Sequence, residues 1–167
     1  DAPVVDLNGG VAGQNNAVTW TEGANVAHVA VNIGASATLS DSDNTNLTQM
    51  QITVAGLSNG NNEVLKIGGV DFQLATDYTN VTAGSFKVSY VSSTGIFTIT
   101  PSGATQTVAN FQTLLRGITY TNTTDNPTSG PRSFTVQVTD AGLLNNGAGG
   151  TNLPSNNPFT TLTVTPA

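Results

Sequence analysis

The feature that most constrains the fold of this chain is a series of short segments in which apolar and polar residues alternate. Alternation with a period of two is typical of β-strands with one buried face, and the Gly, Asn and Ser residues between the segments favour turns. Segments of this kind lie at 17–21, 26–33, 35–39, 47–54, 64–67, 70–74, 86–91, 96–99, 118–122, 133–139 and 159–164. The sequence therefore predicts an all-β protein with many short connections.

The alternation also predicts which side chains face the core. The residues expected to point inward are Trp20, Met50, Ile52, Val54, Phe134, Val136 and Val138. Leu47 falls in phase with Gln49 and Thr53, so it is expected on the outer face of its strand. Between the segments 64–67 and 70–74, Gly68-Gly69 predicts a tight hairpin, because glycine accepts the positive φ of a primed turn.

One segment departs from the β pattern. Val108, Phe111, Leu114 and Leu115 recur at helical spacing between Thr107 and Arg116. Thr107 is a suitable N-cap and Gly117 a suitable stop. A single short helix is predicted over about 107–116, laid across one end of the two-sheet sandwich that many short strands favour.

Composition bounds the class of protein. The 167 residues suit one domain with a sizeable core, and the absence of cysteine excludes disulfides and thiolate metal sites. The net charge of −6 and only four basic residues argue against a nucleic-acid partner. No apolar run approaches the length of a membrane span, and no signal peptide is visible. The start at Asp1-Ala2-Pro3 is expected to be internal to a longer protein.

The few acidic residues gather in specific places. The stretch 41–46 reads Asp-Ser-Asp-Asn-Thr-Asn, and a further acid, Asp140, follows the strand segment 133–139. An extended Asp-x-Asp places both carboxylates on one side. Calcium takes about 6–8 oxygen ligands, which carboxylates and carbonyls supply. Asp41 and Asp43 are therefore candidate calcium ligands, with a solvated acidic turn as the alternative.

Four stretches together resemble a known family. They are Asp1–Gly9, Thr19-Trp20-Thr21-Glu22-Gly23, Leu39-Ser40-Asp41-Ser42-Asp43, and the closing half formed by Phe111–Asn122 with Gly130–Asp140. On these residues the chain resembles the cadherin-like tandem repeats of large bacterial surface proteins and adhesins. The likeness spans nearly the whole chain, so it implies that 1–167 is a single repeat in which 1–10 are the inter-repeat linker and repeat start.

The resemblance implies an Ig-like or cadherin-like β-sandwich that binds Ca²⁺ between successive repeats. By this resemblance Asp41, Asp43 and Asp140 meet at the N-terminal tip. The other residues that it implicates are Asn44 or Asn46 through a carbonyl, Asp1 from the linker, Glu22 at the opposite tip, and Asp125 where a second acidic motif falls. The motif at Asp125 departs from the family, because Thr124-Asp125-Asn126-Pro127 has no second acid.

Two functions remain open from the sequence. The first is a calcium-binding extracellular module, on a secreted or surface-anchored bacterial protein, that spaces and rigidifies an adhesin beside neighbouring repeats. The second is recognition of carbohydrate, or of another copy, through loops such as 141–158. Enzymatic activity is not expected, because the only histidine, His28, lies in an apolar segment without a nucleophile motif. The Gly-rich run 147–150 lacks the strand-to-helix context of a phosphate loop.

Overall fold

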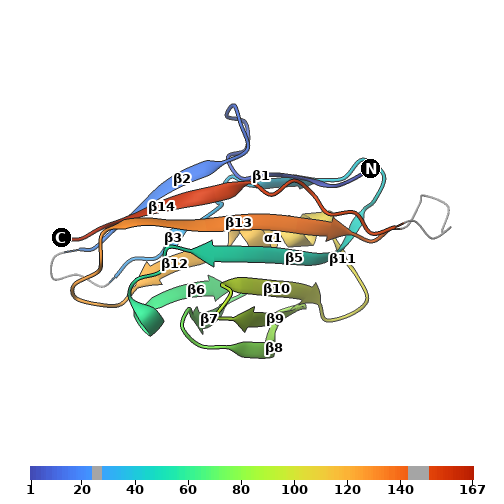
Figure 1. Ribbon diagram of the computed structural model, residues 1–167. Helices are drawn as coiled ribbons and strands as arrows, with labels where there is room; N and C mark the ends of the chain where they lie inside the picture. Colours follow the sequence, from blue (N-terminus) through green and yellow to red (C-terminus); the bar gives the residue numbers. More distant parts are fainter. Residues whose placement is uncertain (24–27, 143–150) are drawn as a thin grey trace.

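The protein is an all-β sandwich with a short helix, as predicted. The computed structural model describes residues 1–23, 28–142 and 151–167, and it places two sheets face to face around one core (Figure 1). The large sheet has the order β2-β14-β13-β5-β10-β9-β8, with β11 paired to the start of β5. The smaller sheet has the order β3-β12-β6-β7, and β1 pairs with β4 in a separate ribbon.

The strands of the large sheet are β2 (Asn16–Thr21), β5 (Asn46–Ala55), β8 (Tyr78–Ala83), β9 (Phe86–Val91), β10 (Ile96–Pro101), β11 (Gln106–Thr107), β13 (Gly130–Asp140) and β14 (Phe159–Thr165). The smaller sheet contains β3 (Val31–Asn32), β6 (Glu63–Ile67), β7 (Val70–Gln73) and β12 (Thr119–Asn122). The ribbon is formed by β1 (Val4–Asp6) and β4 (Thr38–Ser40), and a 3₁₀ turn, η1 (Gly60–Asn62), precedes β6.

The predicted inward-facing residues are buried. Trp20, Met50, Ile52, Phe134 and Val138 have no exposed surface, and Val54 and Val136 are nearly as well covered. Side chains of this size stabilise a fold by about 1.5–3 kcal/mol each when they are removed from water. The period-two pattern therefore identified much of the core that holds the two sheets together.

The prediction for Leu47 was wrong, and a β-bulge explains why. Asp140 of β13 pairs with Leu47, whereas the preceding residue, Thr139, pairs with Gln49, so Thr48 is an extra residue in the ladder. The extra residue breaks the alternation, so that Leu47 and Gln49, on either side of Thr48, point to opposite faces of the sheet. Leu47 therefore points inward and is fully buried.

The predicted hairpin at Gly68-Gly69 is present between β6 and β7. Both glycines have positive φ, 57° and 81°, as a type I′ turn requires. A Cβ on Gly68 would lie 3.0 Å from the Cβ of Ala83, so the turn also packs closely against the end of β8.

The predicted helix is α1 (Val108–Arg116). Thr107 caps it, because its hydroxyl oxygen accepts a hydrogen bond of 3.0 Å from the backbone N–H of Asn110. Phe111 and Leu115 are fully buried. The predicted position was wrong: α1 packs against β4 and β5 in the layer of the smaller sheet, not across one end (Figure 1). Its buried face completes the second layer where the smaller sheet stops.

Some strands were missed or shortened. β1, β8 and β11 were not predicted. The alternation that would have indicated β8 is interrupted by a register shift between Tyr78 and Val81. The predicted strand 26–33 is reduced to β3, and the part of it at 26–27 lies outside the described residues. Likewise, positions 143–150 of the predicted loop 141–158, which include the Gly-rich run, lie outside them.

The two termini lie at opposite ends of an elongated molecule (Figure 1). The chain enters at the end where β5 begins and β13 finishes, and it leaves at the far end, after β14. In the part of the chain that the structure describes, no helix is long and apolar enough to span a bilayer.

Candidate metal site at the N-terminal end

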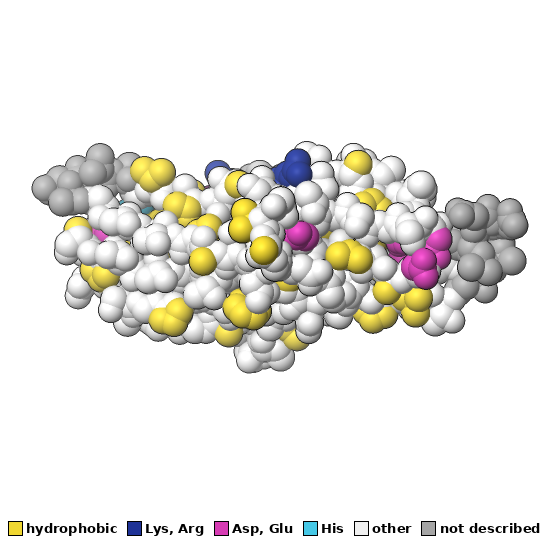
Figure 2. Space-filling model, turned by 90° about the horizontal axis from the view of Figure 1, so that it is seen from above, with side chains coloured by type: hydrophobic (Ala, Val, Ile, Leu, Met, Phe, Trp, Pro, Cys, Tyr) yellow, Lys and Arg dark blue, Asp and Glu magenta, His cyan; other side chains and the backbone are white. Residues whose placement is uncertain are grey.

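Strand ends position the predicted acids. β4 ends at Ser40 and β5 begins at Asn46, so Asp41 and Asp43 lie on the short connection between them. The pairing of Asp140 with Leu47 brings the end of β13 beside that connection. Figure 2 shows acidic side chains gathered at this end of the molecule, next to the residues drawn in grey.

Asp41 closes a local turn and keeps one oxygen free. Its Oδ1 accepts hydrogen bonds from the backbone N–H groups of Asp43 at 3.2 Å and Asn44 at 3.3 Å. Its Oδ2 is shielded from solvent and has no hydrogen-bond partner. Burial raises the pKa of the Asp41 carboxyl, because a shielded charge loses hydration. This oxygen is the feature of the site that most needs a positively charged or donating partner.

Asp1 and Asp43 face each other across the same end. The Asp1 α-ammonium donates a hydrogen bond to Asp43 Oδ2, which holds the pKa of Asp43 below its usual value. The Asp1 carboxylate accepts a hydrogen bond of 2.8 Å from Ser42 Oγ. The pKa of the α-amino group is raised first by its bond to Asp43, and the charges of Asp41 and Asp140 add to the effect. Asp1 thus contacts the acidic turn through both its backbone nitrogen and its carboxylate.

The Asp140 carboxylate accepts hydrogen bonds from the backbone. The residue is 1% exposed, and its Oδ1 accepts hydrogen bonds from the N–H groups of Gly142 at 2.9 Å and Leu153 at 2.8 Å. These bonds fix both sides of the segment that follows β13. The carboxylate therefore has a structural role in the described geometry.

The two predicted asparagines play different parts. Asn44 donates from Nδ2 to Asp43 Oδ1 at 3.3 Å, so it belongs to the acidic turn. Asn46 begins β5, where it pairs with Thr107 of β11. Asn46 therefore supports the turn from the strand that follows it.

The chemical type of the atoms at this end suits a hard cation. Its members are carboxylate and amide oxygens, which Ca²⁺ prefers, and Asp41 Oδ2 is unpartnered. However, within residues 1–23, 28–142 and 151–167 no group of three or more His, Asp or Glu side chains is arranged to hold a metal ion. Calcium binding would require the Asp43 carboxylate to exchange its contact with the Asp1 nitrogen for the ion.

Glu22 and Asp125 lie apart from this set, at the end where the chain leaves. Glu22 Oε2 accepts a hydrogen bond of 3.0 Å from the backbone N–H of Ala167, and the Glu22 N–H donates to the carbonyl of Thr165. Asp125 is fully exposed, and its Oδ1 lies 3.9 Å from His28 Nε2. The predicted residues therefore divide between the two ends of the molecule.

A buried polar network was missed by the sequence analysis. Arg132 and Glu63 form an ion pair with Nε and Oε1 2.6 Å apart, and neither side chain is more than 1% exposed. The hydroxyl of Tyr120 donates to the same Oε1 at 2.8 Å. In sequence, Glu63 was one acid among several and Arg132 one of four scattered basic residues. No local pattern indicated their pairing, because 69 positions separate them.

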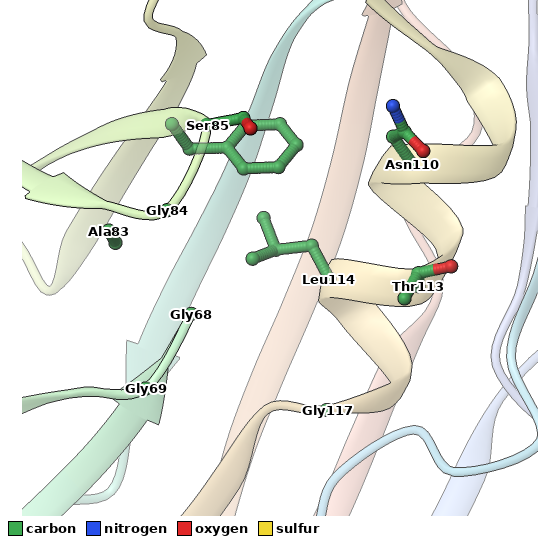
Figure 3. Close-up of a pocket in the computed structure, with 10 residues that line it drawn as sticks. Gly68, Gly69, Ala83, Gly84, Ser85, Asn110, Thr113, Leu114 and Gly117 are labelled. Atoms are coloured by element: carbon green, nitrogen blue, oxygen red, sulfur yellow. The ribbon is translucent and has the colours of Figure 1, made fainter.

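The structure also contains a groove between α1 and two turns, with a volume of about 390 Å³. Its walls are the turns at Gly68-Gly69 and Ala83–Phe86, and α1 contributes Asn110, Thr113 and Leu114. Figure 3 shows the Leu114 side chain directed from α1 toward the turns, with Asn110 and Thr113 along the helix. No charged residue is among those that line the groove, so its chemistry suits a small neutral ligand.

Comparison with known proteins gives no relative from which to transfer a site. No family model, no curated protein and no solved structure matches the chain.

Proposed function

We propose that this chain is a calcium-binding repeat module of a secreted or surface-anchored bacterial protein, which spaces and rigidifies a longer adhesin. The observation that carries the proposal is the placement of the termini at opposite ends, with Asp1, Asp41, Asp43 and Asp140 gathered at the entry end. A module that is joined to neighbouring repeats through its two ends adds its full length to the array. An ion at the entry end would stiffen the junction with the preceding repeat.

Electrostatics support calcium as the partner. The carboxylates of Asp41, Asp43 and Asp140 all act on the Asp1 α-amino group, so they create a shared negative potential at this end. Carboxylates gathered in this way repel each other, and a divalent cation relieves the repulsion. The unpartnered Asp41 Oδ2 supplies the first ligand, and Asp43 supplies the second once it exchanges its contact with Asp1 for the ion.

Calcium is expected to stabilise the protein through these acids. A ligand at 100 times its Kd adds about 2.7 kcal/mol, which corresponds to a rise in Tm of roughly 5–10 °C for a domain of this size. The measurement is a thermal melt in excess EGTA and again in millimolar Ca²⁺. Asp41→Asn/Asp43→Asn should abolish the rise, because both carboxylates proposed to bind the ion are lost.

The matched control removes two charges elsewhere. Asp71→Asn/Asp77→Asn changes the net charge equally at two exposed sites outside the predicted ligand set and should keep the calcium-dependent rise. The proposal is overturned if the wild-type Tm does not respond to calcium, or if both double variants respond like the wild type.

The groove of Figure 3 favours one alternative function, recognition of a neutral carbohydrate. Leu114 and Phe86 offer apolar contacts, whereas Ser85, Asn110 and the exposed backbone of the glycine turns offer hydrogen bonds. If this alternative holds, titration with neutral disaccharides should shift the backbone NMR signals of Gly68, Gly69 and Gly84. Leu114→Trp, which fills the groove, should abolish the shifts. Unchanged spectra across the disaccharide panel would remove the groove from consideration.

A further inference from the structure

The first and last segments of the chain are bonded to each other in parallel. β14 pairs with β2 from Thr160↔Asn16 to Thr165↔Thr21, and it is parallel, whereas the other strand pairs of the described residues are antiparallel. The contact begins before β2, since the N–H of Phe159, the first residue of β14, donates to Asn15 Oδ1 at 2.9 Å. The N-terminal and C-terminal segments therefore run side by side in the same direction.

The side chain of Asn156 extends this contact to β1. Its Oδ1 accepts a hydrogen bond of 2.7 Å from the N–H of Val5, and its Nδ2 donates to the Val5 carbonyl at 2.7 Å. Nδ2 also donates to Gln14 Oε1 at 2.7 Å. The amide thus bonds both backbone groups of one residue, as a neighbouring strand would. β1 is held by β4 through its ladder and by Asn156 through these bonds.

Core packing fixes both segments in place. Val5, Leu7 and Trp20 of the N-terminal segment are buried, as are Leu162 and Val164 of β14. Sliding one segment along the other would pull these side chains out of the core. The contact therefore resists displacement along the strands as well as separation across them.

The positions of the termini determine how force would act on this contact. Tension pulls the start of the N-terminal segment toward one end of the molecule and the finish of β14 toward the other (Figure 1). Because the two segments are parallel, the bonds between them are loaded together, in shear. By contrast, β8 and β9 form an antiparallel pair at the edge of the sheet, away from this line of force.

We propose that the segments Val5–Thr21 and Asn156–Thr165 form a tension-bearing clamp, in which the Asn156 amide fastens β1. Bearing load is a function beyond spacing and calcium binding. The inference rests on the proposed place of the module within a longer chain, but it does not depend on calcium.

Single-molecule force spectroscopy tests the clamp. The protein is pulled through its two ends in EGTA, so that failure of the calcium proposal leaves this result unaffected. Asn156→Ala should raise the unfolding rate under tension about tenfold, because a tenfold change corresponds to about 1.4 kcal/mol and two backbone bonds are lost. Asn156→Asp, which keeps an acceptor for the Val5 N–H, should have a smaller effect.

Asn61→Ala is the matched control. Asn61 is an exposed asparagine with two side-chain hydrogen bonds, since its Oδ1 accepts from the Ala75 N–H and from Thr76 Oγ1 at 3.0 Å each. It lies outside the clamp, so its loss should change the rate under tension by less than about twofold. Urea unfolding of each variant establishes that it is folded. Equal acceleration by Asn156→Ala and Asn61→Ala would overturn the proposal, and so would no acceleration by either variant at Asn156.

Discussion

Replacing Arg132 with methionine is expected to lower the free energy of unfolding by about 3–5 kcal/mol. The substitution leaves the Glu63 carboxylate buried without its counter-charge. It also removes the donors to the carbonyls of Thr128 and Gly130 and to Asn59 Oδ1. A natural domain is stable by about 5–15 kcal/mol, so this one change removes a large part of the total.

The remaining partners of Glu63 explain why the loss is large. Its Oε2 accepts from the backbone N–H groups of Ser58 and Asn59 at 2.7 and 2.8 Å. These bonds hold the connection between β5 and β6 against the start of β13. Burial, and next the charge of Glu63, raise the pKa of Tyr120 above its ordinary value, so its hydroxyl remains a donor to the carboxylate.

Urea unfolding measures this effect, and a double variant separates its causes. Glu63→Gln/Arg132→Met removes both charges, so it should recover part of the stability that Arg132→Met loses. If Arg132→Met unfolds within about 1 kcal/mol of the wild type, the ion pair does not hold these connections.

Trp20→Ala is expected to cost about 3–5 kcal/mol, the range for an aromatic side chain removed from a core. Trp20 has no exposed surface. Its ring stacks on His28 with centroids 6.0 Å apart and meets Tyr120 edge-on at 6.2 Å. The cavity would open between β2 and the smaller sheet. Circular dichroism in urea is the suitable probe, because the substitution removes the only tryptophan.

Trp20→Phe serves as the control. Trp20 Nε1 has no hydrogen-bond partner, so phenylalanine forfeits no bond and only part of the packing. Its cost should be clearly below that of alanine. Equal losses for both variants would mean that ring size, and not burial of an aromatic side chain, dominates at this position.

Much of the secondary structure could be predicted because its causes are local. The buried faces of β5 and β13 follow from residues two positions apart, and the hairpin at Gly68-Gly69 follows from two adjacent glycines. The helix could be predicted from its apolar spacing and from the Thr107 cap. Where an extra residue entered the ladder at Thr48, the same reasoning failed for Leu47, because only the partner strand reveals a bulge.

The candidate metal site was predictable in part. Its residue types and the connection between β4 and β5 were visible in the sequence. Two features were not visible in the sequence, because they depend on side-chain directions: the unpartnered Oδ2 of Asp41 and the hydrogen bonds that Asp140 accepts from the Gly142 and Leu153 amides. Calcium binding itself stays a prediction, for which the melts described above are the test.

The sequence by itself determined the all-β class, the inward faces of the main strands and the short capped helix. Each depends on residues within a few positions of one another. Only the tertiary structure decided that Glu63 pairs with Arg132 and that the Asn156 side chain bonds the backbone of Val5, 151 positions away. Such pairings are set by strand register and by the packing of two sheets, which join parts of the chain whose sequences carry no mark of each other.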